Sequence, residues 1–141
     1  MADFSVFMAG NAVKNDTVKF VASKRFKAKG KPVEWEIKSI DSDLEEALRK
    51  ESTKRVPIAG KRGQYNMETD SDKFMGKLCV ACTVYPDLNN TELQDSYGVK
   101  SGEALLKKML LPGEYTEYKA KVMEVNGYDL SMEELVDEAK N

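Results

Sequence analysis

The chain has 141 residues, of which 41% are apolar and 33% charged, and its formal net charge is −2. This length predicts one domain, residues 1–141, that buries a hydrophobic core without disulfides or metal ions. No apolar run approaches the roughly 20 residues that span a bilayer, and the start, MADFSVFMAGN, lacks the basic region of a signal peptide. We therefore expect a reducing compartment and no membrane partner. Histidine, the commonest general base and metal ligand, is absent.

The charge is divided unevenly along the chain. Residues 1–65 carry 14 Lys and Arg against 9 Asp and Glu, whereas residues 66–141 carry 8 against 15. The asymmetry either steers the protein towards another chain or its own copies, or reflects two solvated faces of different composition. No nucleic acid partner is expected: the acidic pI argues against one, and Gly60-Lys61-Arg62-Gly63 lacks the Ser or Thr and the upstream glycine of a phosphate-binding loop.

Residues 1–16 predict an extended or irregular lead-in, because glycine and asparagine interrupt a short alternation of apolar residues. Phe4 and Phe7 either dock on the domain or form an adhesive segment for a partner. Residues 17–40 then predict a β-hairpin with one apolar face, since alternating segments flank the turn-forming sequence KAKGKP. That face needs helices to pack on. Trp35 is expected in the core rather than stacked on a ligand.

Residues 41–55 predict a short amphipathic helix that begins with the capping box Ser42-Asp43-Leu44-Glu45 and ends before Pro57. Residues 56–69 predict a loop, because they hold two glycines, one proline and the basic group Lys61-Arg62. A loop of this length within a compact domain is usually functional or disordered.

Residues 70–141 predict the helical part of the chain, and its first helix is the expected centre of the fold. Apolar residues recur there at spacings of three and four from Phe74 to Tyr85, after the capping residues 70–72 and before Pro86. A strand is the alternative for the second half of this helix, because β-branched residues gather there: Val80, Thr83 and Val84.

Further helices are expected after a turn at 87–90. They cover 91–97, then 101 to the break at Pro112-Gly113, then 114–126, and a last helix starts at the capping box of Ser131. Gly98 and Gly127 stand where helices end. The fold class that this pattern indicates is α+β, with an N-terminal β-hairpin packed on a mostly α-helical C-terminal bundle.

Cys79 and Cys82 have a C-x-x-C spacing, but the chain offers no further cysteine or histidine to complete a zinc site of about four ligands. A redox dithiol needs its first cysteine exposed at a helix N-terminus. We expect instead that both cysteines pack in the core. A thiol-dependent enzyme is a further hypothesis that rests on these two residues alone. We assign no catalytic, cofactor-binding or metal-binding residue.

Six stretches follow one another along nearly the whole chain. They are VKFVASKRF at 18–26, VEWEIKSI at 33–40, EEALRKESTKRVPIAGKRGQY at 45–65, VYPDLNNTELQDSYGV at 84–99, LLPGEY at 110–115 and EVNGYDLSMEELVDEAKN at 124–141. In number and order they resemble the phage tail assembly chaperones of the XkdN type, which occur in myophage-like and PBSX-type prophage elements.

The resemblance implies a non-enzymatic role. Such a protein binds the aggregation-prone tape measure protein in the bacterial host cytoplasm and keeps it soluble while tail tube protein assembles around it. It is absent from the mature particle. Several tail chaperones also have a longer form made by ribosomal frameshifting, and Ala139-Lys140-Asn141 can be encoded by a slippery A-AAA-AAN run. The alternative is a structural minor tail component that stays in the particle.

The expected partners are therefore the tape measure protein, the tail tube protein, the chain's own frameshift-extended form and further copies in a homo-oligomer. The expected mechanism is a holdase, in which an apolar groove or strand edge covers Leu-rich segments of the tape measure protein. Tyrosines suit such an interface because they combine a large contact area with a polar tip. The candidate contacts are equally suited to complete the core: Tyr85, Leu88, Leu93, Tyr97, Tyr115 and Tyr118.

Overall fold

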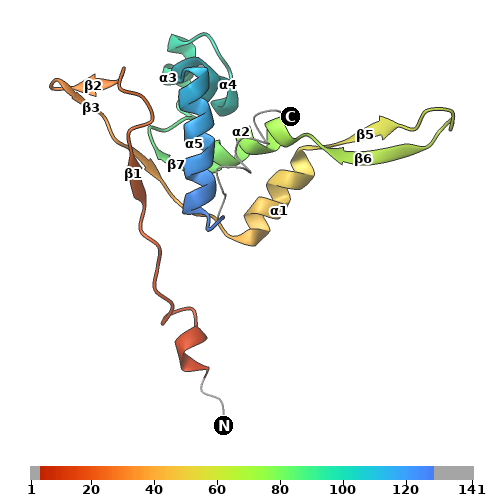
Figure 1. Ribbon diagram of the computed structural model, residues 1–141, viewed down its shortest axis with the longest axis horizontal. Coiled ribbons are helices and arrows are strands. Elements are labelled where there is room, and N and C mark those ends of the chain that lie inside the picture. Colours follow the sequence, from red (N-terminus) through yellow and green to blue (C-terminus); the bar gives the residue numbers. More distant parts are fainter. Residues whose placement is uncertain (1–3, 129–141) are drawn as a thin grey trace.

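The computed structural model describes residues 4–128 and has the α+β fold that the sequence predicts. A small antiparallel sheet packs against helices, and two extensions leave this body (Figure 1). The helix predicted from Ser131 lies outside the described residues, and the single domain over 1–141 stays a prediction. In chain order the elements are η1 (Ser5–Phe7), β1 (Val18–Phe20), β2 (Lys27–Ala28), β3 (Lys31–Pro32), β4 (Trp35–Ile37), α1 (Ser42–Glu51), β5 (Thr53–Pro57), β6 (Tyr65–Thr69), α2 (Ser71–Cys82), β7 (Thr83–Tyr85), α3 (Thr91–Ser96), α4 (Gly102–Met109) and α5 (Pro112–Val125).

The predicted N-terminal hairpin is confirmed and gains a third strand. β1 pairs antiparallel with β4, placing Phe20 opposite Trp35, and β2 pairs with β3 beyond them. β7 pairs with the other edge of β4, so the strand order is β1-β4-β7. α2 ends at Cys82, so the helix predicted up to Pro86 is wrong for its last residues. The strand alternative is confirmed for Thr83 and Val84 in β7 but not for Val80, which is helical. The Thr83 hydroxyl donates to the Cys79 carbonyl at 2.6 Å and closes the helix end.

α2 is the centre of the fold, as predicted, and contacts α1, α4, α5 and β7. The Asp70 carboxylate accepts a hydrogen bond from the Lys73 N–H at 3.1 Å and caps this helix. Trp35 is 1% exposed and meets the Tyr118 ring edge-on, with 5.2 Å between centroids, so its predicted core position is confirmed. Other side chains exposed by no more than 1% complete this core: Ile37, Leu78, Cys79, Cys82, Leu88, Leu105, Leu106 and Val122.

Two predicted helix starts are wrong by one or more residues. Asp41, not Ser42, caps α1, since its carboxylate accepts from the Leu44 N–H at 2.8 Å. An aspartate here also brings negative charge to the positive end of the helix dipole. Pro112-Gly113 opens α5 instead of ending α4, because a proline at the first helical position loses no hydrogen bond.

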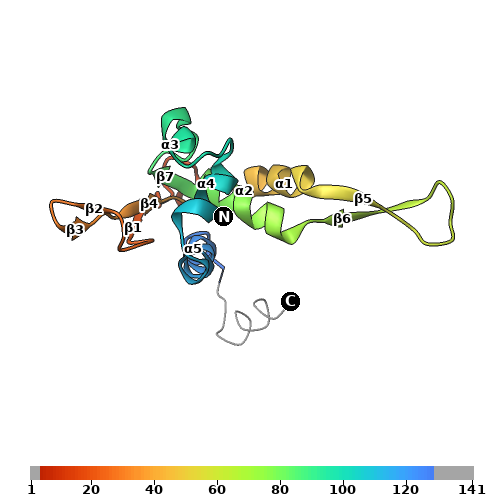
Figure 2. The same cartoon turned by 90° about the horizontal axis from the view of Figure 1, so that it is seen from above.

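The loop predicted over 56–69 is also wrong, because most of it belongs to a second β-hairpin. β5 and β6 pair antiparallel from Thr53 opposite Thr69 to Pro57 opposite Tyr65. This hairpin, which we call the arm (residues 53–69), projects away from the body (Figures 1 and 2). Every residue of β6 is exposed. Strands that rest on no core lack the apolar alternation that reveals a half-buried strand in a sequence.

The close approach of α4 to α2 generates the first prediction. A Cβ atom added at Gly102 would lie 2.8 Å from Cγ1 and 3.0 Å from Cγ2 of Val80. We expect Gly102→Ala to lower the free energy of unfolding by about 1–3 kcal/mol, as overpacked core sites do. Gly113→Ala is the matched control, because its Cβ would meet no atom within 4 Å. Urea unfolding measures both variants, and equal stability of the two would contradict the tight α2–α4 contact.

Candidate partner-binding surfaces

The structure separates the six candidate contacts by their exposure. Leu88 and Tyr118 are 1% and 0% exposed, so they complete the core, which is one of the two alternatives for them, and neither side chain is available to a partner. Leu93, Tyr97 and Tyr115 are partly buried and pack against the core. Tyr85 is the last residue of β7, the edge strand that pairs with β4; it is 50% exposed and is the most accessible of the six.

The hydroxyl of Tyr118 explains why a tyrosine is buried at this position. It lies 2.5 Å from the Thr83 hydroxyl, so the polar tip has a partner where α2 ends and β7 begins. Burial raises the pKa of Tyr118 well above its usual range and raises the pKa of Tyr115 to about 12. Tyr118 therefore acts in the core, joining α5 to the sheet.

A group of exposed apolar side chains lies outside the core, on the N-terminal segment (residues 4–16). This segment runs away from the body in an extended path after the short η1 turn (Figure 1). The sequence left two alternatives for it, docking on the domain or exposure to a partner, and in this structure it is exposed. Its apolar side chains are each at least 61% exposed: Phe4, Val6, Phe7, Met8 and Val13.

The arm has two faces of different character. Side chains of directly opposed residues lie on the same face of an antiparallel ladder, so Arg55 and Met67 share one face with Pro57 and Tyr65. Tyr65 and Met67 are 53% and 64% exposed. The Arg55 guanidinium lies 5.8 Å from the centroid of the Tyr65 ring. Arginine, tyrosine and methionine are enriched in protein interfaces, and this composition makes the face a candidate binding surface.

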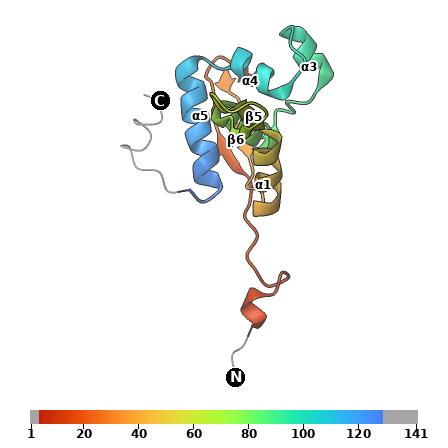
Figure 3. The ribbon, with the colours of Figure 1, turned by 90° about the vertical axis from the view of Figure 1, so that its right-hand side faces the viewer.

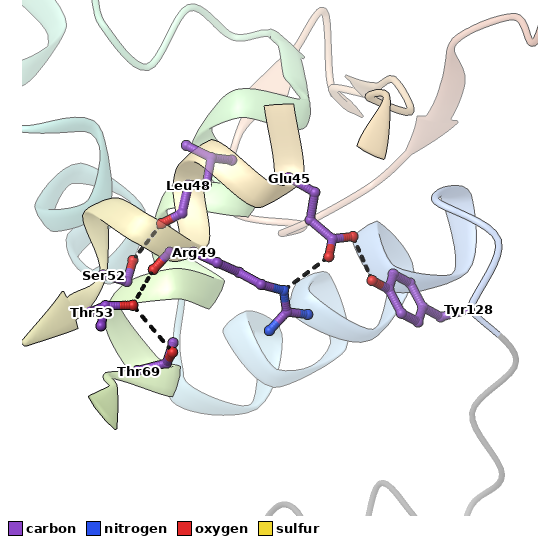
Figure 4. Close-up of polar contacts among 7 residues, drawn as sticks. All are labelled: Glu45, Leu48, Arg49, Ser52, Thr53, Thr69 and Tyr128. Carbon is purple, nitrogen blue, oxygen red and sulfur yellow. Dashed lines mark hydrogen bonds and ion pairs between the residues drawn. The ribbon is translucent and has the colours of Figure 1, made fainter. Parts of the chain in front are cut away.

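The arm is fixed to the body at its base, since α1 leads into β5 and β6 leads into α2 with one residue between each pair. The Thr53 hydroxyl donates to the Arg49 carbonyl at 2.8 Å and lies 3.3 Å from the Thr69 hydroxyl (Figure 4). The Ser52 hydroxyl donates to the Leu48 carbonyl at 2.9 Å, and the Asp70 N–H donates to the Ser52 carbonyl at 2.8 Å. Both strands are thus tied to α1, which sets the direction of the arm.

Arg49 links this base to the neighbouring helices. Its guanidinium lies 4.2 Å from the centroid of the Phe74 ring on α2 and pairs with Glu45 at 3.0 Å. The second oxygen of the Glu45 carboxylate accepts a hydrogen bond from the Tyr128 hydroxyl, just after α5 (Figure 4). The Tyr128 hydroxyl, with Arg49, holds the pKa of Glu45 below its usual range. Arg49 therefore links α1 to α2, and Glu45 links α1 to the residue Tyr128 that follows α5.

The arm is basic. Lys54 and Arg55 lie on β5, and Lys61 and Arg62 lie at its tip between two glycines, with Glu68 as the one acidic residue of residues 53–69. Gly60 and Gly63 have φ of +76° and +78°, which favour glycine and allow the tight tip. None of the four cations forms an ion pair with another described residue. The arm therefore presents unpaired positive charge, which favours an acidic partner.

A second charged surface surrounds α3. We call residues 84–98 the α3 lobe, and it contains Asp87, Glu92 and Asp95 but no Lys or Arg. All three carboxylates are exposed, and none is ion-paired with a described residue. Val84 and Tyr85, which open the lobe, are 43% and 50% exposed. The lobe thus combines negative charge with exposed apolar area. It lies away from the arm in each view (Figures 1 and 2).

The two cysteines are free and buried, so the prediction that they pack in the core is confirmed. Burial raises the pKa of Cys79 to about 12 and also raises the pKa of Cys82. Within residues 4–128, no three His, Cys, Asp or Glu side chains are grouped so that they could hold a metal ion. No helix in that range is long and apolar enough to cross a membrane.

Burial of the thiols predicts that they react slowly with thiol reagents. A rise of the Cys79 pKa to about 12 from an ordinary value of 9.0 lowers the thiolate fraction near pH 8, by roughly a thousandfold. We expect both cysteines to react with a disulfide reagent at least about 100-fold more slowly in the native protein than in denaturant. Absorbance of the released thiol measures both rates, and fast labelling of the native protein would contradict the buried position.

The arm's lack of core residues predicts that the body folds without it. None of the buried core residues lies between 53 and 69. We expect replacement of residues 54–68 by Asn-Gly, a two-residue turn joining Thr53 to Thr69, to shift the melting temperature by less than about 4 °C. Leu105→Ala is the contrast, because cavities at buried leucines cost about 2–5 kcal/mol. Circular dichroism measures the melting temperature of both variants. Unfolding of the shortened chain would show that the arm supports the fold.

Comparison with known proteins identifies relatives of this chain in sequence and in structure. The family model described as phage XkdN-like tail assembly chaperone protein matches residues 4–140. Two proteins of Bacillus subtilis (strain 168) match 99% of this chain. The phage-like element PBSX protein XkdN is 32% identical with 94% of its length covered, and the protein YqbN is 35% identical with 93% covered. The crystal structure of YqbN matches with a TM-score of 0.79 at 32% identity, over 92% of this chain and 99% of that chain.

Proposed function

Because the chain belongs to the phage XkdN-like tail assembly chaperone family, we propose that it binds the tape measure protein and keeps it soluble during assembly of the tail tube. It does so in the host cytoplasm and without catalysis, as a holdase that lowers the concentration of free, adhesive chain. The single observation that supports this role is the N-terminal segment, whose large apolar side chains are exposed beside a core that is complete without them.

A holdase needs apolar surface that a partner can reach. Contiguous exposed apolar patches are uncommon in soluble monomers and mark interaction sites. Phe4 and Phe7 are three residues apart around η1, and this spacing places two side chains on one side of a 3₁₀ turn. Met8 adds an unbranched, adaptable side chain that fits irregular partners. Such a segment suits the binding of many different apolar stretches along one long partner chain.

Tyr85 is the second proposed contact with the tape measure protein. It is the most exposed of the six predicted residues, and it follows an exposed Val84 on the outer strand of the sheet. Leu93, Tyr97 and Tyr115 pack partly against the core. Leu88 and Tyr118 contribute through the stability of the fold rather than through contact.

Co-expression with the tape measure protein tests this function. We expect the native chain to shift the tape measure protein into the soluble fraction and to co-purify with it. The triple variant Phe4→Ser/Phe7→Ser/Met8→Ser removes three exposed apolar side chains and should lower co-purification at least about tenfold, as loss of interface anchors does. The matched control is Leu44→Ser/Leu111→Ser, which changes side chains 42% and 53% exposed on the body.

Two outcomes would contradict the proposal. If the tape measure protein stays insoluble and unbound beside the native chain, this chain does not hold it. If the chain is found by mass spectrometry as a stoichiometric part of purified particles, it is a structural tail component, since a chaperone is released before the particle matures.

A further inference from the structure

We propose that the arm of one copy of this chain binds the α3 lobe of a second copy, so that the protein associates head to tail with itself. The contact face of the arm carries Arg55, Tyr65 and Met67, and the basic tip lies beyond them. The inference concerns the protein alone and goes beyond the proposed function, because it requires no tape measure protein.

Among residues 4–128, nothing covers the contact face of the arm. A two-stranded ribbon is marginally stable in water unless a face of it is covered. Here five cross-strand pairs extend from the body, and all five residues of β6 are exposed. The Tyr65 and Met67 side chains are more than half exposed on one face. A ribbon with this composition gains stability when a second surface covers that face.

Charge selects the surface that fits. The arm has four cations and one anion, whereas the α3 lobe has three anions and no cation. Single exposed ion pairs contribute little. Several charges of one sign that face several of the other steer association and fix its register. Each surface also carries exposed apolar area, Tyr65 and Met67 on the arm and Val84 and Tyr85 on the lobe. The two surfaces therefore match in both charge and apolar character.

Geometry makes the contact intermolecular. β6 enters the N-terminal end of α2, and β7, which leaves the C-terminal end of the same helix, leads into the α3 lobe. Figure 3 looks along the arm and shows α5 and α1 on either side of it, with α3 set apart. The hydrogen bonds at the base hold the arm in this direction. An arm so held does not reach its own lobe.

The arm and the lobe are different surfaces, so the proposed contact is heterologous. Each added copy leaves one free arm and one free lobe, and such contacts build closed rings or open filaments. Two other acidic occupants are outcomes of the test. One is residues 129–141, which hold five Asp and Glu against one Lys. The other is an acidic segment of the tape measure protein.

A charge exchange tests the proposal on the full chain by sedimentation velocity. The arm variant is Lys61→Glu/Arg62→Glu, and the lobe variant is Glu92→Lys/Asp95→Lys, so each variant makes its arm and lobe alike in sign. We expect the native chain to associate in a concentration-dependent manner that weakens with added salt. Each variant alone should associate at least about tenfold more weakly. An equimolar mixture should regain association, because every arm again meets a lobe of opposite sign.

The matched control is Lys27→Glu/Lys31→Glu, which makes the same change of charge on the exposed hairpin β2–β3. It should associate like the native chain. A native chain that is monomeric at all concentrations, single variants that associate normally, or a mixture that stays dissociated would each overturn the proposal. So would a loss of association on removal of residues 129–141 with none on reversal of the lobe charges. These outcomes are independent of tape measure solubility, so either proposal can fail alone.

Discussion

The burial of α2 is the constraint on which the rest of the structure depends. β6, α2 and β7 follow one another with at most one residue between them, so residues 65–85 form one continuous path through the protein. The middle of this path is locked in the core by Leu78, Cys79 and Cys82. One end carries the arm and the other leads into the α3 lobe. Packing of a single helix thus sets the positions of both charged surfaces relative to each other.

Small residues allow α2 to be enclosed so closely. At Gly76 and Gly102 the helices α2 and α4 approach until an added Cβ would meet a neighbouring side chain at 3.2 Å or less. Cys79 and Cys82 serve the same purpose further along the helix, as small apolar residues with no exposed surface. Their C-x-x-C spacing therefore follows from helical packing. The burial that makes them useful there raises their pKa and suppresses thiolate chemistry.

The elements that rest on the core could be predicted from the sequence, because a helix or strand with one buried face carries apolar residues at its own periodicity. The strand at Trp35 and the helix from Asp70 are examples. The arm was missed because neither of its faces lies on the core, and its register depends on pairing between Thr53 and Thr69 that no local pattern reveals. The sequence also did not predict how deeply each side chain is buried. Periodicity gave Tyr115 and Tyr118 a common side of one helix, yet only Tyr118 reaches Trp35 and Thr83.

The two extensions differ in the physical force that each can use. Residues 4–13 carry apolar side chains and no acidic or basic one, whereas the arm's tip carries Lys61 and Arg62. Binding there depends on buried area and tolerates salt. Binding through the arm depends on charge, which salt screens over about 8–10 Å. Because the core is complete without either extension, one surface can be occupied without unfolding the body or covering the other. The proposed self-association would cover Tyr85 on the α3 lobe, but it leaves the apolar N-terminal segment accessible for the proposed binding of the tape measure protein.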